Sequence, residues 1–420
     1  MRKLTGLLSA ALISLSVFSL KAQDDFLFKP KQVFDGKETH SNWVVAVKGN
    51  RITYVGAKYA GQANEVIELK NQTLLPGLIE GHSHILLHPY NEVSWNDQVL
   101  KESIAERSAR AVNHLKASLM AGITTMRDLG SEGAGYADVG MKQAVEKGVI
   151  PGPRLLVAGK AIVATGSYGP KGFHEGVEVP LGAETADGFD DLIRVTRDQI
   201  GHGADFIKVY ADYRWGPNGT AEATFTVTEL KTIVEIAESS GRYVVAHASS
   251  EEGMRRAIEA GIETIEHGDG ATPEIFKMMK EKGVAFCPTL AAGDAITQYG
   301  GWKRGADPEP ARITAKRKSF KMALDSGVKM VFGGDVGVFS HGENVRELEM
   351  MVEYGMNTEA ALISATSANA EQFHLNQLGQ IKAGFLADII AVQGDPSTDI
   401  TSLRKVSLVM KDGKIYKNEN

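Results

Sequence analysis

The chain has 420 residues, of which 43% are hydrophobic and 23% are charged, a composition typical of a globular protein. This length allows one large domain or two to three smaller ones. The formal net charge is −6 and no run of Lys and Arg stands out, which argues against nucleic acid as a partner. The single cysteine, Cys287, excludes an internal disulfide, and its apolar surroundings predict a buried strand residue rather than a nucleophile.

The N-terminal 22 residues have the pattern of a secretory signal peptide. Arg2 and Lys3 supply positive charge, an apolar stretch covers 7–20, and Ala22 precedes a polar segment. We therefore expect cleavage after Ala22 and a secreted or periplasmic protein that no longer contacts the membrane. An uncleaved N-terminal anchor is the alternative, although the apolar stretch is short for a helix that spans a bilayer.

Short apolar runs alternate with amphipathic helical segments over 76–375. The eight apolar runs cover 78–85, 123–127, 154–158, 206–210, 243–247, 264–267, 284–289 and 330–335. Many of the helical segments close on a glycine, which suits the left-handed conformation at a helix C-terminus: Gly122, Gly148, Gly241, Gly261, Gly283 and Gly327. Buried strands that alternate with helices pair in parallel, so eight such units predict an α/β fold, a (β/α)8 barrel of the TIM type. A doubly wound open sheet is the alternative, but no glycine-rich phosphate loop follows the first run.

Both flanks of this region are rich in predicted β-strands. In 23–75, two apolar runs surround a turn at Gly49-Asn50, and in 376–420 two runs surround a turn at Asp412-Gly413. We expect the two flanks to form one small β-sandwich domain that packs on the barrel.

Candidate metal ligands recur where the predicted barrel strands end. The six are His82, His84, Lys208, His247, His267 and Asp335. His82 and His84 are two residues apart, so an extended strand directs both imidazoles to the same face. Taken singly, each of the six fits an ordinary role, as a solvated lysine, a helix-capping aspartate or a structural histidine. Their joint occurrence at the barrel rim, where catalytic groups collect, indicates a metal site.

The stretch 75–84, Leu-Pro-Gly-Leu-Ile-Glu-Gly-His-Ser-His, resembles the metal-binding start of the amidohydrolase superfamily. The spacing of Lys208, His247, His267 and Asp335 completes the same pattern, and 379–389 resembles the return of such chains into their small β-domain. The resemblance covers essentially the whole mature chain. It is greatest to the branch that holds imidazolonepropionase-like proteins, Xaa-Pro dipeptidases (prolidases) and ochratoxin-hydrolysing amidases.

This resemblance implies two divalent metal ions, with zinc as the expected element. The histidine pair of the first strand and Asp335 would bind the more buried ion, His247 and His267 would bind the second, and Lys208 would bridge both as N6-carboxylysine. Asp335 would also be the catalytic residue, which takes the proton of a metal-bridging hydroxide and passes it to the leaving amine. The residue types suit this role, because imidazole and carboxylate bind zinc-like ions, and a carbamate can bind a cation whereas an ammonium group cannot.

Loop residues near the rim are the candidates for substrate contact. They are His174, Tyr210, Tyr213, Arg214, His341 and Asn344. The three that follow Lys208 are placed to meet a substrate carboxylate, and ordinary loop packing is the alternative role. Some prolidase-like relatives have a tyrosine two residues after the histidine that corresponds to His247. This chain has Ser249 there, which weakens the case for a proline-type carboxylate.

We therefore expect a metal-dependent hydrolase that cleaves an amide bond in a small molecule such as a dipeptide or an N-acyl amino acid. A cyclic amide, an imidazolone or a lactone is the alternative substrate within the superfamily. Imidazolonepropionases and deaminases usually use one metal without the lysine ligand, so Lys208 favours two metals and hydrolysis. A non-catalytic binding protein on the same fold is a third interpretation, disfavoured because all six ligand positions are filled. The expected partner is a small-molecule substrate, and a homo-oligomer is left open.

Overall fold

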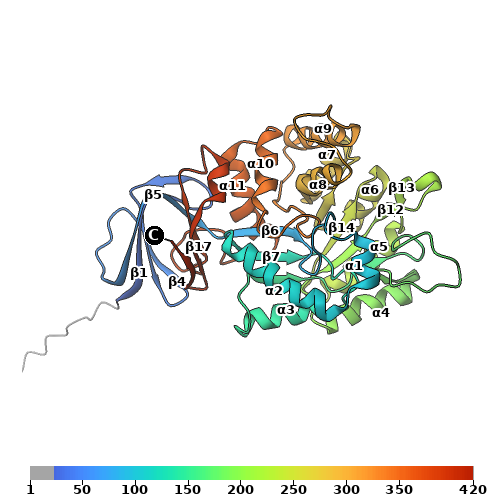
Figure 1. The fold of residues 1–420 in the computed structure, drawn as a ribbon, viewed down its shortest axis with the longest axis horizontal. Helices are drawn as coiled ribbons and strands as arrows, with labels where there is room; N and C mark the ends of the chain where they lie inside the picture. Colours follow the sequence, from blue (N-terminus) through green and yellow to red (C-terminus); the bar gives the residue numbers. More distant parts are fainter. Residues whose placement is uncertain (1–22, 420) are drawn as a thin grey trace, which may run out of the picture.

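The computed structural model describes residues 23–419. The predicted signal peptide, residues 1–22, lies outside the described residues. Figure 1 shows two lobes, a β-rich lobe that holds the C-terminus and a larger lobe in which helices surround a central group of strands. Within residues 23–419, no helix is both long enough and apolar enough to cross a membrane.

The β-rich lobe is an eight-stranded sheet built from both ends of the chain. Its strands are β1 (Asp24–Phe34), β2 (Thr39–Ser41), β3 (Val44–Lys48), β4 (Arg51–Gly56), β5 (Ala63–Pro76), β17 (Ile389–Gln393), β18 (Val406–Lys411) and β19 (Lys414–Asn418). β5 pairs in parallel with β1 and antiparallel with β17, so direct backbone bonds join the two ends. Both predicted turns are present, one between β3 and β4 and one between β18 and β19.

This terminal sheet wraps around its own apolar core. Phe28, Val45 and Leu408 are buried in that core and come from both ends of the chain. The sheet curls because its edge strand β4 meets the segment before β17, where Ile52 N donates to Phe385 O at 3.0 Å. Within residues 23–419 the strands are therefore hydrogen bonded as one curled sheet, an arrangement consistent with the predicted small β-sandwich domain.

The larger lobe contains parallel strands that fall on seven of the eight predicted apolar runs. These strands are β6 (Leu78–Ser83), β7 (Ile123–Asp128), β8 (Arg154–Val157), β11 (Ile207–Tyr210), β14 (Val244–Ala248), β15 (Thr264–His267) and β16 (Ala285–Cys287). β6, β7 and β8 form one parallel sheet, and β11, β14, β15 and β16 belong to a second with β9 (Ile162–Val163) and β10 (Glu184–Thr185). The eighth run, 330–335, is not a regular strand. Isolated bridges mark its two ends, from Met330 to Phe286 and from Val336, the residue after the run, to Ser83.

Backbone hydrogen bonds connect the two parallel sheets at both seams. At the first seam, Val331 N donates to Phe286 O at 3.0 Å and Asp335 N donates to His82 O at 2.9 Å, so the eighth run lies between β16 and β6. At the second seam, Asp205 N donates to Val157 O at 2.8 Å, which links β8 to the start of β11. Followed through these hydrogen bonds, the order is β6, β7, β8, β11, β14, β15, β16 and then the eighth run, which again meets β6. This is the order expected of a closed parallel barrel.

Helices cover the outside of the larger lobe (Figure 1). They are α1 (Trp95–Lys101), α2 (Ile104–Met120), α3 (Ala137–Glu146), α4 (Gly188–Gly201), α5 (Val227–Glu238), α6 (Glu251–Ala260), α7 (Pro273–Lys282), α8 (Leu290–Tyr299), α9 (Ala311–Ser326), α10 (Val345–Glu353), α11 (Thr358–Ile363) and α12 (Asn369–Gln372). All six glycines predicted to end helices have a positive φ, which runs from +67° at Gly327 to +93° at Gly261. Glycine adopts this conformation without steric cost, so the predicted helix ends are confirmed.

One large apolar core joins the two lobes. Ile390 and Val409 of the terminal sheet are buried in the same cluster as Leu115 of α2 and Met126 of β7. Cys287 is buried in β16, as the sequence predicted. Because the terminal sheet contributes to the main core, it fixes the position of the strands that carry the candidate site.

Candidate metal centre and substrate cavity

The predicted histidine and aspartate ligands lie together where the parallel strands end. The ring centroids of His82 and His84 are 5.5 Å apart, and those of His82 and His267 are 5.1 Å apart. His247 lies 4.6 Å from His267 by the same measure. Asp335 Oδ1 is 3.5 Å from His82 Nε2 and 3.4 Å from His84 Nε2. Strands that are distant in sequence thus bring these five side chains into one cluster.

Lys208 reaches the same cluster from β11. Its side chain is buried and makes no ion pair with a carboxylate of residues 23–419; its Nζ lies 5.5 Å from the centroid of the Tyr210 ring. Burial lowers the pKa of Lys208, and the nearby carboxylates of Glu266 and Asp335 oppose this effect. Burial, together with the nearby Lys208, also lowers the pKa of His247 to about 3. The site therefore favours neutral imidazole, the form that binds metals.

Two donor atoms of the cluster are buried without a hydrogen-bond partner. They are His82 Nε2 and Asp335 Oδ1, and no residue of 23–419 satisfies either. Buried polar atoms in proteins nearly always have a partner, so two unsatisfied atoms 3.5 Å apart fit a cation that both would bind. Imidazole and carboxylate donors are also the set that zinc-like ions prefer. The residues present therefore fit a divalent metal ion.

A buried ion pair holds His82 from behind. His82 Nδ1 lies 2.8 Å from Glu266 Oε2, and Arg127 donates to Glu266 Oε1 at 3.1 Å. All three side chains are fully buried. The contact occupies Nδ1 and leaves Nε2 for the site, which is how a second carboxylate orients a histidine ligand.

The other histidines of the cluster are oriented in the same way. His84 Nδ1 is 3.0 Å from Gly130 O, and His267 Nδ1 is 2.7 Å from Thr289 Oγ1. In both cases Nδ1 is engaged, so Nε2 is the nitrogen left to bind a metal.

The backbone is left-handed at four non-glycine residues around the site. The φ angles are +49° at Glu132, +75° at His267, +49° at Thr289 and +61° at Asp335. Such conformations cost about 1–3 kcal/mol each and persist where surrounding contacts enforce them, often at functional sites. Two of the four residues, His267 and Asp335, are predicted metal ligands, and Thr289 orients one of these two by its contact with His267.

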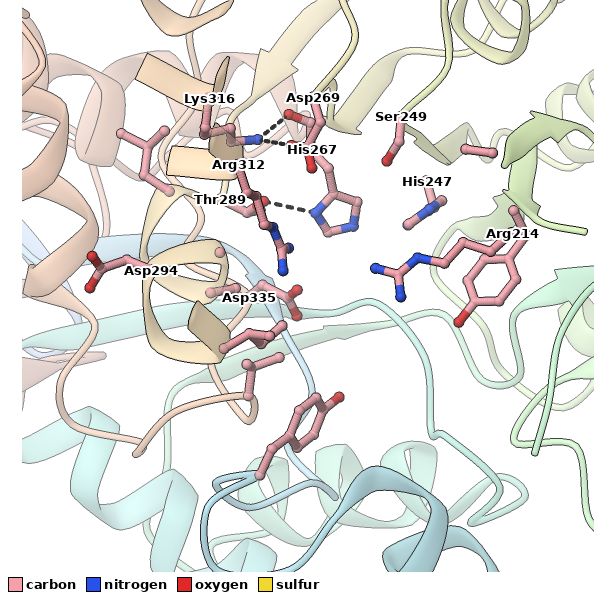
Figure 2. Close-up of a pocket in the computed structure, with 18 of the residues that line it drawn as sticks. Arg214, His247, Ser249, His267, Asp269, Thr289, Asp294, Arg312, Lys316 and Asp335 are labelled. Atoms are coloured by element: carbon pink, nitrogen blue, oxygen red, sulfur yellow. Dashed lines mark hydrogen bonds and ion pairs between the residues drawn. The ribbon is translucent and has the colours of Figure 1, made fainter. Parts of the chain in front are cut away.

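A cavity of about 560 Å³ opens in front of the cluster. This volume is in the range of sites for small molecules. Figure 2 shows His247, His267 and Asp335 around the opening. One side is formed by four aromatic side chains in mutual contact, the aromatic wall: Trp95, Tyr168, Tyr210 and Tyr213.

Three of the six predicted substrate contacts line this cavity, and three do not. Tyr210, Tyr213 and Arg214 are lining residues. His174 is exposed in the loop before α4, where its Nδ1 accepts a hydrogen bond from Gly176 N at 3.0 Å. Sequence position alone placed His174 near the rim, but the loop folds so that its imidazole is directed to solvent.

His341 and Asn344 lie behind the site rather than in the cavity. His341 is stacked on His114, with ring centroids 4.3 Å apart. Asn344 is buried and donates to Glu80 Oε2 at 2.8 Å, and Glu80 Oε1 accepts from His82 N at 3.1 Å. Asn344 is therefore connected to β6, the strand that carries His82, through the carboxylate of Glu80. It lies behind the site because the chain turns inward just before α10 begins.

Sequence inspection missed several residues that support or line the site. Glu266 carried a signal, since it is a charged residue inside the apolar run 264–267 and is followed directly by a predicted ligand. Arg312 carried no such signal in the sequence, because it lies in α9 and not at the end of a strand. Its place in the cavity wall depends on how α9 packs, which no local pattern reveals.

Comparison with known proteins gives a consistent result over most of the chain. Residues 73–416 match the model of the amidohydrolase family. The ochratoxinase of Aspergillus niger is 30% identical over 372 residues, which cover 82% of this chain and 75% of the relative. A solved Xaa-Pro dipeptidase with bound methionine has a TM-score of 0.83 at 30% identity, covering 94% of this chain and 100% of that one. The crystal structure of the Aspergillus niger ochratoxinase has a TM-score of 0.81 at 27% identity and covers 94% and 96%.

Proposed function

The chain belongs to the amidohydrolase family, and from this premise we propose that it cleaves an amide bond in a small substrate such as a dipeptide or an N-acyl amino acid. The resemblance drawn from the sequence, to a branch with prolidases and ochratoxin-hydrolysing amidases, is confirmed. The observation that carries the proposal is the pair of buried, unsatisfied atoms His82 Nε2 and Asp335 Oδ1, of which Asp335 lines a cavity of small-molecule size.

We propose that the parallel strands close into a (β/α)8 barrel, with the terminal sheet as a second domain. The backbone bonds at both seams support this arrangement. Secretion directed by residues 1–22 stays a prediction, because those residues lie outside the described part of the chain.

The donor set supports two divalent metal ions, with zinc as the proposed element. His82, His84 and Asp335 offer donor atoms that all lie within 4.8 Å of one another, which suits one ion. His247 and His267 are the proposed ligands of the second. When bound, the ions would supply Lewis acidity, which polarises a carbonyl and lowers the pKa of water.

Lys208 is proposed to become a carbamate that bridges the two ions. Burial lowers its pKa and so favours the neutral amine, which is the form that reacts with carbon dioxide. The reaction forms one N–C bond and releases one proton, and the side chain then carries a negative charge. This change turns a residue that repels cations into a bidentate acceptor for them.

Asp335 is the proposed proton carrier. It faces the cavity in Figure 2, close to where a scissile carbonyl would meet the metal ligands. Burial raises the pKa of Asp335 to about 6, while His84 and Lys208 lower it. A carboxylate that faces the cavity from the proposed metal centre can take the proton of the attacking water and return it to the leaving amine.

Metal analysis together with Asp335→Asn tests the proposal. We expect the purified protein to bind two zinc ions per chain, and Asp335→Asn to lower the rate of hydrolysis of N-acyl amino acids by about 10²–10⁴-fold. Lys208→Ala should lose bound metal as well as activity. His202→Asn is the control, since this exposed histidine ends α4 outside the cavity.

Two results would contradict the proposal: a protein that binds no divalent metal, or an Asp335→Asn variant with the wild-type rate. Lactones, imidazolones and cyclic amides belong in the same assay, because a preference for them would redirect the proposal within the family.

A further inference from the structure

Two arginine side chains enter the cavity from different elements. Arg214 ends β12 (Asp212–Arg214), and Arg312 lies in the first turn of α9. Figure 2 shows both guanidinium groups pointing into the opening, Arg214 on the side of His247 and Arg312 on the side of Thr289 and Asp335. Neither guanidinium makes an ion pair or a hydrogen bond within residues 23–419. The cavity wall thus presents two free cationic groups beside the proposed metal centre.

The acidic side chains of the same cavity wall do not neutralise these arginines. Asp269 is paired with Lys316, whose Nζ lies 2.5 Å from its Oδ1. Asp294 is paired with Arg346 and, at 3.3 Å, with Arg304. Asp294 is therefore engaged by other cations. Asp269 is paired with Lys316, which lowers its pKa, and Arg312 lowers that pKa further only by a weaker electrostatic interaction without an ion pair.

The remaining acidic lining residues are engaged by neutral donors. Asp212 accepts hydrogen bonds from Ser249 N at 2.8 Å and Ser250 N at 2.6 Å. Glu132 accepts from the Tyr168 hydroxyl at 2.7 Å and from an indole N–H at 2.8 Å. Apart from Asp335, which belongs to the metal centre, no acid lining the described cavity is free to pair with either arginine.

We propose that the substrate is a dianion with one carboxylate on each side of the scissile amide, and that Arg214 and Arg312 each bind one of the two. This inference rests on the proposed amide hydrolysis and names its substrate class. A substrate that fills the cavity removes water from both guanidinium groups, and each then needs a new acceptor. One guanidinium fork satisfies both oxygens of a carboxylate, so a single carboxylate would neutralise only one arginine.

The position of the arginines explains why the two charges flank the amide. Arg214 lies beside His247 and Arg312 beside Asp335, so each guanidinium group enters the opening next to a different proposed metal ligand (Figure 2). An amide carbonyl over those ligands would direct its acyl part to one arginine and its amino-acid carboxylate to the other. The aromatic wall is left to contact an apolar side chain, which makes a carboxyacyl derivative of an aromatic amino acid a suitable probe.

The test uses three probes with the zinc-loaded enzyme. N-succinyl-phenylalanine has both carboxylates, N-succinamoyl-phenylalanine lacks the acyl one, and N-succinyl-phenylalanine amide lacks the amino-acid one. We expect kcat/KM for the dianion to exceed that for each monoanion by at least about tenfold, the scale of one charged hydrogen-bonded contact. Arg214→Met and Arg312→Met should each abolish one of the two preferences and keep the other.

Arg197→Met is the matched control, because this arginine is exposed on α4 and does not line the cavity. Equal kcat/KM for all three probes would overturn the dianion inference and leave amide hydrolysis standing. If the enzyme hydrolyses none of the three probes and no other N-acyl amino acid, the proposed function is overturned instead. In that case calorimetric titration still tests the arginines: tighter binding of the dianion supports the inference, and equal affinity overturns it.

Discussion

Glu266 lies outside the proposed ligand set but supports the proposed metal centre. It orients His82 through a 2.8 Å contact and balances the charge of the buried Arg127. In Glu266→Gln an amide replaces one acceptor oxygen, and Arg127 keeps a buried charge without a counterion. We expect zinc affinity to fall about 10–100-fold and the free energy of unfolding to fall by about 3–5 kcal/mol. Competitive zinc titration and urea unfolding of the metal-free protein measure the two effects.

Glu263→Gln is the control for that experiment. Glu263 lies one residue before β15 and pairs with the exposed His374 at 2.9 Å. Loss of an exposed pair changes stability by less than about 1 kcal/mol. A Glu266→Gln variant that behaves like this control would show that the carboxylate does not support His82.

At the scale of single residues, the sequence predicted which proposed ligands lie together better than it predicted which loop residues line the cavity. The clustering could be predicted because strand ends of parallel sheets meet at one edge, so order along the chain translates into proximity. His174 and His341 could not be placed in this way, because the fold of a loop decides whether its side chain meets the cavity, solvent or the core.

Among the elements, α8 begins without a cap of its own. Thr289 at its N-cap has a φ of +49°, and its side chain does not cap the helix. Instead Glu347, from α10, accepts hydrogen bonds from Leu290 N at 2.9 Å and Ala291 N at 2.7 Å. Burial raises the pKa of Glu347 to about 8, although the two N–H bonds oppose the shift.

This raised pKa predicts a pH dependence of stability. Between about pH 4.5 and pH 8 the folded protein keeps a proton on Glu347 that the unfolded chain releases. Its contribution to stability is therefore complete below about pH 4.5 and is lost as the pH rises toward 8, at up to about 1.4 kcal/mol per pH unit. Glu347→Gln should make the unfolding free energy less steep in pH over this window. Urea unfolding at several pH values measures it, and an unchanged slope would contradict the prediction.

The eighth apolar run marks the limit of prediction at the scale of elements. Seven runs are strands, but 330–335 is not, although it occupies the predicted place between β16 and β6. A Cβ at Gly333 would lie 2.7 Å from His82 N and 2.6 Å from Cys287 Sγ, so the segment is held by close contact rather than by a ladder. The pattern of apolar residues indicates that a segment is buried. It does not distinguish a segment paired in a β-ladder from one held by close packing.

For the whole molecule, the sequence predicted a lobe built from both termini but not how firmly it is joined to the larger lobe. The shared core contains Ile390 and Val409 of the terminal sheet next to side chains of α2 and β7. Such a core depends on which faces of distant elements meet, which local patterns do not encode. Because the apolar cluster crosses the boundary, we expect the two lobes to unfold together.

Arg154 provides the test of this coupling. It lies on β8 and pairs across the boundary with Asp388 at 3.0 Å and with Asp412 at 2.5 Å. Asp388 has only 3% of its side chain exposed, so Arg154→Met leaves a buried carboxylate without its cation. We expect the unfolding free energy to fall by about 2–4 kcal/mol, below the cost of breaking a fully buried pair because Arg154 is partly exposed.

Differential scanning calorimetry separates the two parts of this prediction. Arg154→Met should melt at a lower temperature but still in a single transition, because the shared apolar core remains intact. Lys29→Met is the control, since Lys29 and Glu68 form an exposed pair within the terminal sheet, and its loss should change stability by less than about 1 kcal/mol. Two separate transitions in the wild-type protein would show that the terminal sheet folds independently. An Arg154→Met variant as stable as the wild type would show that the apolar cluster alone joins the lobes, and the ion pair would then serve only to align the C-terminal strands with β8.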